Sequence, residues 1–156
     1  MPKKPIVKHN EQRAYYHSGE DFINMPKLDS FVSSGRYYGT LFHELVHSTG
    51  HSERLSRREL LEQKGPKTRD YAIEELTAEM GASYLKSYTG IPHQNFEDNI
   101  AYMQYWLEKL QKDKTFIVHA SGLAQKAVDY ILNERVVEKE FGIIEDKAIS
   151  NDEKIS

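Results

Sequence analysis

One pentapeptide, His43-Glu44-Leu45-Val46-His47, constrains this 156-residue chain more than any other feature. In a helix, two histidines four residues apart lie on the same face, so both imidazoles can reach one metal ion. The glutamate beside the first histidine lies at the edge of that face, where it can take a proton from a water molecule that the metal activates. The pattern therefore predicts zinc ligands at His43 and His47 and a general base at Glu44.

The residues around the motif favour a helix at about 35–49. Four apolar side chains share one arc of that helix: Leu41, Phe42, Leu45 and Val46. The polar groups of the motif fill the opposite arc, so we expect them together at one wall of a cleft. Ser34 is a suitable N-cap, and Gly50 is suited to the position just after the last turn.

The composition is that of a soluble globular domain, with 38% hydrophobic and 29% charged residues. A net charge of −3 argues against nucleic-acid binding over a broad basic surface. Because the chain has no cysteine, zinc must be held by histidine and carboxylate ligands. The sequence shows no signal peptide and no membrane-spanning stretch, so we expect a cytoplasmic protein.

The first part of the chain predicts a small β region. Residues 1–13 are polar and basic, which is typical of a flexible arm. Short strands are expected at 14–17 and 22–25, on either side of a turn. We expect these strands to form a hairpin, with 22–25 as an edge along which an extended substrate can lie.

The second part of the chain predicts helices. Three segments have helical periodicity: residues 69–88, 95–112 and 115–134. Thr68 is a suitable cap for the first of these, whereas residues 51–67 are charged and irregular. With the motif helix, about four helices follow the β region, so we expect a mostly helical α+β fold.

We expect the folded domain to span residues 14–134. Residues 135–156 are acidic and lack any periodic pattern, which predicts a disordered tail.

A catalytic zinc site needs a third protein ligand and one open position. The best cluster is acidic and begins the second long helix. There Glu75 and Glu79 share a face with small residues that would let another helix come close, whereas Glu74 points away from that face. We expect one of the first two to bind the metal and the other to hold the free ring nitrogen of a ligand histidine. Periodicity alone does not choose between them.

Residues just after the motif offer rival roles. Glu53 lies six residues after His47, where a longer zinc-binding pattern has its third histidine. Glutamate matches that position poorly, so Glu53 ranks second as a ligand. Four residues are candidates for contacts with the substrate or the oxyanion: His51, Tyr37, Tyr38 and His119.

Three blocks of sequence together resemble a known family. They are Tyr37-Tyr38-Gly39-Thr40-Leu41-Phe42 with the motif that follows, the upstream segment 21–26, and the downstream segment 71–79. They are similar to the zincin-like metallopeptidase domain at the C-terminus of ArdC-type antirestriction proteins. Related domains occur in plasmid primases and phage polyvalent proteins. The resemblance covers roughly residues 14–133.

The resemblance implies a zincin fold with one zinc per chain. Comparison with zincins that take a third ligand from a later helix favours Glu75 on the metal and Glu79 as its support. Family members usually carry an N-terminal domain that binds single-stranded DNA. Here about a dozen residues precede the first expected strand, as in a stand-alone or shortened form, so no direct nucleic-acid binding is expected from this domain alone.

These features favour a zinc metallopeptidase of antirestriction or mobile-element type, acting on a protein or peptide. The alternative is a non-catalytic zincin scaffold that binds a host restriction or DNA-processing protein. A third hypothesis is DNA binding through the basic stretch 54–58 together with Lys64, Lys67 and Arg69, although glutamates at 53, 59 and 62 dilute its charge.

Overall fold

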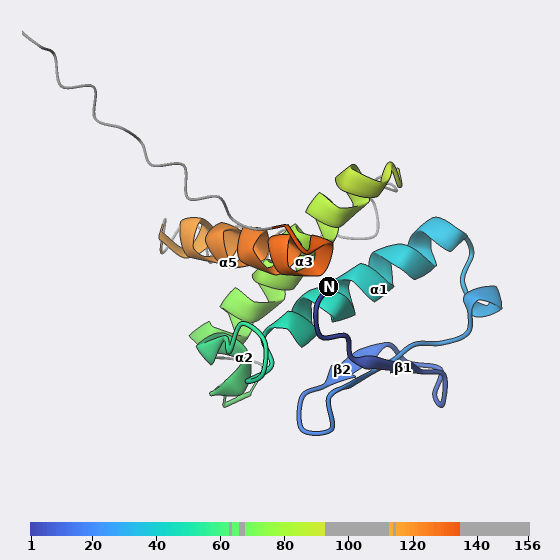
Figure 1. Ribbon diagram of the computed structural model, residues 1–156, viewed down its shortest axis with the longest axis horizontal. Coiled ribbons are helices and arrows are strands. Elements are labelled where there is room, and N and C mark those ends of the chain that lie inside the picture. Colours follow the sequence, from blue (N-terminus) through green and yellow to red (C-terminus); the bar gives the residue numbers. More distant parts are fainter. Residues whose placement is uncertain (63, 66–67, 93–112, 114, 135–156) are drawn as a thin grey trace, which may run out of the picture.

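Helix α1 (Ser34–Thr49) lies between a small sheet on one side and helices α3 (Arg69–Thr89) and α5 (Thr115–Leu132) on the other (Figure 1). The computed structural model describes residues 1–62, 64–65, 68–92, 113 and 115–134. Within these residues, three strands are followed by four α-helices, the fourth being the short α2 (Arg58–Leu61). The expected mostly helical α+β fold is confirmed.

The sheet contains β1 (Ile6–Lys8), β2 (Tyr15–His17) and β3 (Phe22–Asn24) in the order β1-β3-β2. The antiparallel pairing of β2 with β3 is the expected hairpin. Two expectations were wrong. Part of the expected arm forms β1, which pairs in parallel with β3. Because β3 is therefore the central strand, the free edge next to α1 belongs to β2. A three-residue strand is too short to show a periodic pattern in the sequence.

Asn24 holds the segment that leads into β2. Its side chain is fully buried, and its Oδ1 accepts hydrogen bonds from the backbone N–H groups of Asn10 (3.0 Å) and Glu11 (3.3 Å). Its Nδ2 donates to the carbonyls of Glu11 and Arg13. One buried amide thus satisfies four backbone groups, which fixes the path of the chain just before the edge strand.

The ends of α1 follow local capping rules with one shift. The N-cap is Ser33 and not Ser34, and its hydroxyl accepts from the backbone N–H of Arg36 at 3.2 Å. Gly50 ends the helix in a right-handed conformation (φ −76°), so a left-handed turn is not the reason for glycine. A Cβ there would lie 2.8 Å from Leu60 and 2.9 Å from the guanidinium of Arg57. Close approach of these side chains requires glycine.

The long helices lie close to their expected bounds. Thr68 caps α3 by accepting from the backbone N–H of Tyr71 at 3.2 Å, and the helix stops at the left-handed Gly90 (φ 70°). Helix α2 lies within a stretch expected to be irregular. The helix expected at 95–112 and the tail expected at 135–156 lie outside the described residues. No described helix is long and apolar enough to cross a membrane.

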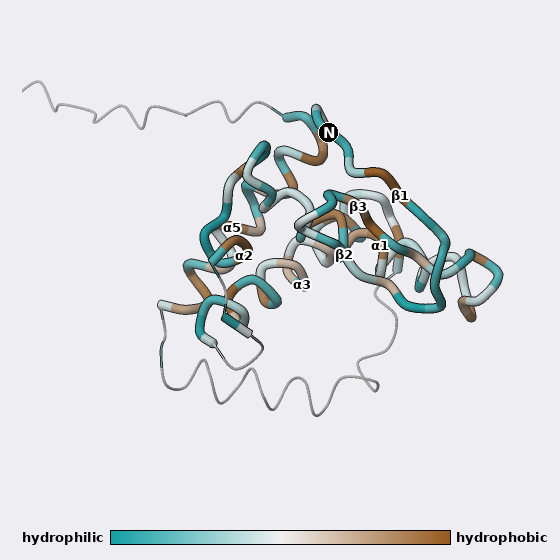
Figure 2. Tube along the Cα trace, turned by 90° about the horizontal axis from the view of Figure 1, so that it is seen from below, coloured by the Kyte–Doolittle hydropathy of each residue, from teal (hydrophilic) through white to brown (hydrophobic). Residues whose placement is uncertain are grey.

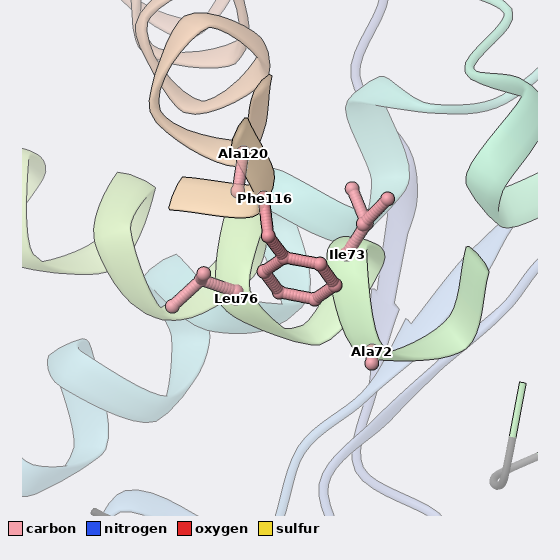
Figure 3. Packing of buried hydrophobic residues seen from close by; sticks show 5 residues of the cluster. All are labelled: Ala72, Ile73, Leu76, Phe116 and Ala120. Atoms are coloured by element: carbon pink, nitrogen blue, oxygen red, sulfur yellow. The ribbon is translucent and has the colours of Figure 1, made fainter. Parts of the chain in front are cut away.

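The core lies mainly between α3 and α5. One cluster of buried side chains joins these two helices: Ala72, Ile73, Leu76, Phe116 and Ala120 (Figure 3). A second cluster brings in α1: Val46, Ala78, Leu85, Ala127 and Val128. Hydrophobic residues also occur in β1 (Figure 2), outside these clusters, and Ile6 of that strand is exposed.

Small residues on α3 bring that helix close to α1. A Cβ on Gly81 would lie 2.7 Å from Cγ2 of Val46, which is fully buried. Ala78 and Ala82 are also buried on α3. The approach of the two helices places the motif histidines opposite the acidic face of α3, as the small residues beside Glu75 predict.

Candidate metal centre

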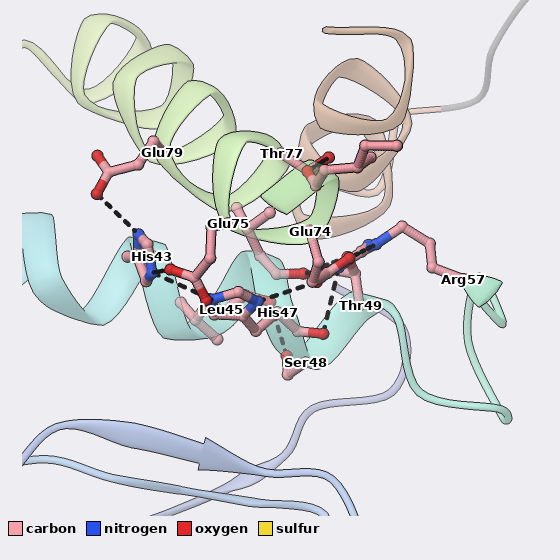
Figure 4. A network of polar contacts seen from close by, with 12 residues as sticks. His43, Leu45, His47, Ser48, Thr49, Arg57, Glu74, Glu75, Thr77 and Glu79 are labelled. Atoms are coloured by element: carbon pink, nitrogen blue, oxygen red, sulfur yellow. Dashed lines mark hydrogen bonds and ion pairs between the residues drawn. The ribbon is translucent and has the colours of Figure 1, made fainter. Parts of the chain in front are cut away.

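His43, His47 and Glu75 bring three potential ligand atoms to one point between α1 and α3 (Figure 4). The two Nε2 atoms are 3.1 Å apart. The Glu75 oxygens lie 3.6 Å from Nε2 of His47 and 3.8 Å from Nε2 of His43. Ligands at about 2.0–2.1 Å from a tetrahedral zinc are about 3.3 Å apart, and the three separations bracket this value. The donor set therefore fits a divalent ion without any change of fold.

A buried carboxylate orients His47. Its Nδ1 lies 2.9 Å from Oε1 of Glu74, whose side chain is 1% exposed. Arg57 donates to the same carboxylate from Nε to Oε2 (2.8 Å) and from Nη2 to Oε1 (2.6 Å). With Nδ1 donating to Glu74, Nε2 of His47 keeps its lone pair for a metal.

The sequence did not predict the contact between Glu74 and His47. The helical wheel places Glu74 correctly off the face of Glu75, but that direction is not solvent. The segment that follows α1 covers it and supplies Arg57. The periodicity of α3 carries no signal for this contact because the partner comes from another element.

Burial and charge set the ionisation of these groups. Burial by itself raises the pKa of Glu74, but hydrogen bonds from Arg57 and His47 outweigh it and hold that pKa at about 2. Burial, together with the nearby charge of His47, lowers the pKa of His43 to about 3. His43 is therefore neutral at pH 7, as a ligand must be. Burial also raises the pKa of Glu44, which suits a proton acceptor.

The outer end of the centre is more open. Oε1 of Glu79 lies 3.5 Å from Nδ1 of His43, and the Glu79 side chain is 43% exposed. Glu79 thus stands where the sequence places a support for a ligand histidine, one turn beyond Glu75.

A cavity opens beside the three ligand atoms. It is lined by residues of β2, α1, α2 and α3: Ala14, Tyr15, Tyr16, His43, Glu44, His47, Leu60, Tyr71 and Glu75. Glu44 is 9% exposed, and the backbone of Tyr16 forms a hydrogen bond to its carboxylate. The cavity wall therefore joins the motif glutamate to the edge strand.

Several residues proposed from the sequence lie elsewhere. Glu53 is 66% exposed and pairs with Lys3 at 2.9 Å, so it is not an alternative ligand. The chain turns back after Gly50 and carries residue 53 to the surface. Four residues do not line this cavity: His51, Tyr37, Tyr38 and His119. Tyr37 packs edge-on against Tyr38 in the first turns of α1, and His119 bonds to Glu59 at 2.8 Å.

The basic stretch 54–58 is not a basic surface. The side chains of Arg54 and Arg57 are each 2% exposed. Arg54 forms two hydrogen bonds of 2.7 Å to Asp21, and Arg57 forms its pair with Glu74. Two of its three arginines are thus buried ion-pair partners and do not form a basic surface for DNA. Arg69 pairs with Asp113 at 3.0 Å, and Lys67 lies outside the described residues.

Comparison with known protein families is consistent with the arrangement of His43, His47 and Glu75. The family model described as zincin-like metallopeptidase matches residues 3–123. This chain belongs to the zincin-like metallopeptidase family. Among curated proteins, the domain is 38% identical to two proteins named DNA primase TraC from Escherichia coli, over 127 and 120 residues. The two alignments cover 81% and 77% of this chain but only 12% and 8% of those primases.

Two solved structures share the fold of this zincin-like domain. Both are of the antirestriction protein ArdC from plasmid R388, one bound to Mn(II) and one free of metal. The Mn(II)-bound structure is 40% identical with a TM-score of 0.69, and the metal-free structure is 39% identical with a TM-score of 0.65. The alignments cover 83% and 85% of this chain and 47% and 46% of ArdC, so the domain spans about half the length of that protein.

Proposed function

We propose that this zincin-like domain is a zinc-dependent metallopeptidase in which His43, His47 and Glu75 hold the metal. The observation that carries the proposal is the convergence of these three ligand atoms beside Glu44 in a cavity. Two histidines and a glutamate are the ligand set of many catalytic zinc sites. A divalent ion is also supported by the Mn(II)-bound structure of ArdC. A bound metal polarises the scissile carbonyl and makes water easier to deprotonate.

Glu44 is the proposed general base. It lines the cavity next to His43 in the chain. Burial raises its pKa, which makes the carboxylate a stronger proton acceptor. In the proposed reaction Glu44 takes the proton of the attacking water and then gives it to the leaving amine.

The edge of β2 is the proposed binding strand for an extended peptide. It lies at the cavity, whereas β3, the strand expected to serve as the edge, is paired on both sides. A peptide that adds to β2 would form backbone hydrogen bonds that are independent of its sequence.

Tyr71 is the proposed donor to the oxyanion. It lines the cavity on α3 one turn before Glu75, and a phenol hydroxyl is a suitable donor to a developing oxyanion. It replaces the candidates named from the sequence, none of which lines this cavity.

The test is Glu44→Gln, which keeps the size and shape of the side chain but removes the base. We expect the variant to retain one metal per chain and to lose hydrolysis of a mixed peptide library by at least about 1,000-fold. Glu53→Gln, at the exposed pair with Lys3, is the control and should match wild type. Hydrolysis that persists in Glu44→Gln would rule out this mechanism.

A second candidate is a non-catalytic scaffold that acts by binding a host restriction or DNA-processing protein. It would use the same preformed centre, in which Glu74 contacts both Arg57 and His47. The kinship with ArdC and TraC suggests an antirestriction or mobile-element setting for either function. A plasmid-transfer assay with Glu44→Gln separates them, because a scaffold keeps full protection in that variant and a peptidase loses it.

A further inference from the structure

The most connected buried side chain near the centre is that of Arg57, which no motif includes. We propose that Arg57 and Glu74 form a positioning pair that holds the His47 ring in its metal-binding orientation and so sets the affinity of the centre for its metal. The proposal rests on the ligand set proposed above, but it does not require catalysis.

The first step concerns the carboxylate of Glu74. Oε1 accepts from Nδ1 of His47 at 2.9 Å and from Nη2 of Arg57 at 2.6 Å, and Oε2 accepts from Nε of Arg57 at 2.8 Å. Both oxygens are therefore fixed by the planar guanidinium, and the direction of the third hydrogen bond is fixed with them. The ring of His47 has little freedom to rotate away from the metal.

The second step concerns the other side of the same guanidinium. Nη2 donates to the carbonyls of Val46 at 2.7 Å and His47 at 3.3 Å, and Nη1 donates to the hydroxyl of Thr49. Arg57 thus contacts the backbone of His47 directly and its ring through Glu74 (Figure 4). Backbone and ring are held by one rigid group.

The third step concerns residue type. Lysine has the charge of arginine but is a point donor, so it cannot donate in parallel to both oxygens of Glu74 and also reach the helix carbonyls. Gly50 leaves the space in which the guanidinium lies, since a Cβ there would be 2.9 Å from Nη2. The geometry is therefore specific to arginine.

The chain supplies a matched control in Arg54. Its side chain is also 2% exposed, donates two hydrogen bonds of 2.7 Å to Asp21, and donates to the carbonyl of Ser48 at 3.0 Å. Arg54 thus resembles Arg57 in the burial of its own side chain, in pairing with a carboxylate and in its contact with the end of α1, although Asp21 is 34% exposed and Glu74 1%. Within the described residues, Arg54 donates to Asp21, Ser48 and Lys3, and no hydrogen bond joins it to Glu74 or His47.

The experiment measures zinc affinity by competition with a chromophoric chelator. We expect Glu74→Gln to weaken binding by about 10–100-fold and Arg57→Lys by roughly 3–10-fold, with Arg54→Lys unchanged. Arg57→Lys should weaken binding less in the Glu74→Gln background than in wild type, because its hold on the His47 ring runs through that carboxylate. The visible spectrum of bound Co²⁺ should change in the first two variants and not in the third. Circular dichroism establishes that each variant is folded.

Three outcomes would overturn the proposal. They are an unchanged zinc affinity in Arg57→Lys, equal losses in Arg57→Lys and Arg54→Lys, and fully additive losses in the double variant. The last would mean that Arg57 acts through the helix end and not through Glu74. A wild type that binds no zinc would overturn both proposals. A wild type that binds zinc tightly yet hydrolyses no peptide would overturn the proposed function alone.

Discussion

The two histidines of the motif differ in how the fold holds them. His47 has its Nδ1 2.9 Å from a carboxylate that is 1% exposed and is itself paired with a buried arginine. His43 has its Nδ1 3.5 Å from Glu79, which is 43% exposed and one turn farther out. One candidate ligand is therefore fixed from the protein interior, and the other faces a carboxylate at the surface.

This difference shows that the spacing of the motif and the burial of its surroundings contribute separately to the arrangement of the two histidine rings. The spacing of four residues puts both rings on one face, but burial at one end decides which ring is rigid. We infer that the rigid end would supply a preformed ligand, whereas the ring of His43 is held by fewer buried partners. The predictions below test that asymmetry, from the largest expected effect to the smallest.

The carboxylate that the two ends share should matter most. Glu75 faces both Nε2 atoms, so Glu75→Ala should lower the metal content from one per chain to nearly none. Glu79→Ala should retain the metal, because Glu79 faces the outer nitrogen of His43. Elemental analysis of both variants after the same purification decides the matter. Metal lost from Glu79→Ala and kept in Glu75→Ala would exchange the two roles.

The supporting carboxylates should differ in their effect on stability. Glu74→Ala leaves the buried guanidinium of Arg57 without its charge partner, which should lower the free energy of unfolding by about 3–5 kcal/mol. Glu79→Ala removes a side chain at the surface and should change it by less than about 0.5 kcal/mol. Urea unfolding of the metal-free proteins measures both values. Equal losses of unfolding free energy in Glu74→Ala and Glu79→Ala would mean that the surroundings of His47 and His43 do not differ in this way.

Helix packing should show the same asymmetry. Gly81→Ala would press a methyl group against Val46, which is fully buried, and should cost about 1–3 kcal/mol of unfolding free energy. Gly39→Ala, one turn before His43, would meet the flexible end of Lys86, which can move aside. Its effect should be near neutral or stabilising by up to about 1 kcal/mol, because alanine favours the helix. Thermal unfolding compares the two variants.

The ion pair of Asp21 with Arg54, which contacts the C-terminal end of α1, should make stability depend on pH in acid. Burial opposes the shift, but hydrogen bonds from Arg54 and Tyr16 place the pKa of Asp21 below its ordinary value of 3.8. The folded state therefore binds the proton more weakly than the unfolded state. Its stabilising contribution is complete above pH 3.8 and is lost as pH falls through the lower folded-state pKa.

Asp21→Asn should remove that acid-dependent component. Unfolding of the metal-free variant should then depend less steeply on pH below 3.8 than unfolding of wild type. An unchanged slope would mean that the Asp21–Arg54 pair contributes no pH-dependent stability. We expect this effect to be the smallest of the four.

Local patterns in the sequence were sufficient for the features that depend on near neighbours. Helical spacing places His43, Glu44 and His47 on α1, and hydrogen-bonding side chains near the helix starts predict the caps to within one residue. The small residues of α3 predict its close approach to α1. These features depend on residues a few positions apart, where spacing along the chain is also spacing in space.

The sequence by itself therefore determined the motif helix, the acidic helix opposite it and the choice of ligand types. The tertiary structure alone decided that Glu74 turns inward, that β2 is the edge at the cavity, and that Glu53 lies at the surface. The bonds of Glu74 reach across 27 residues to His47 and 17 residues to Arg57. No local period encodes such a contact, because it forms only when α1, α3 and the segment between them pack together.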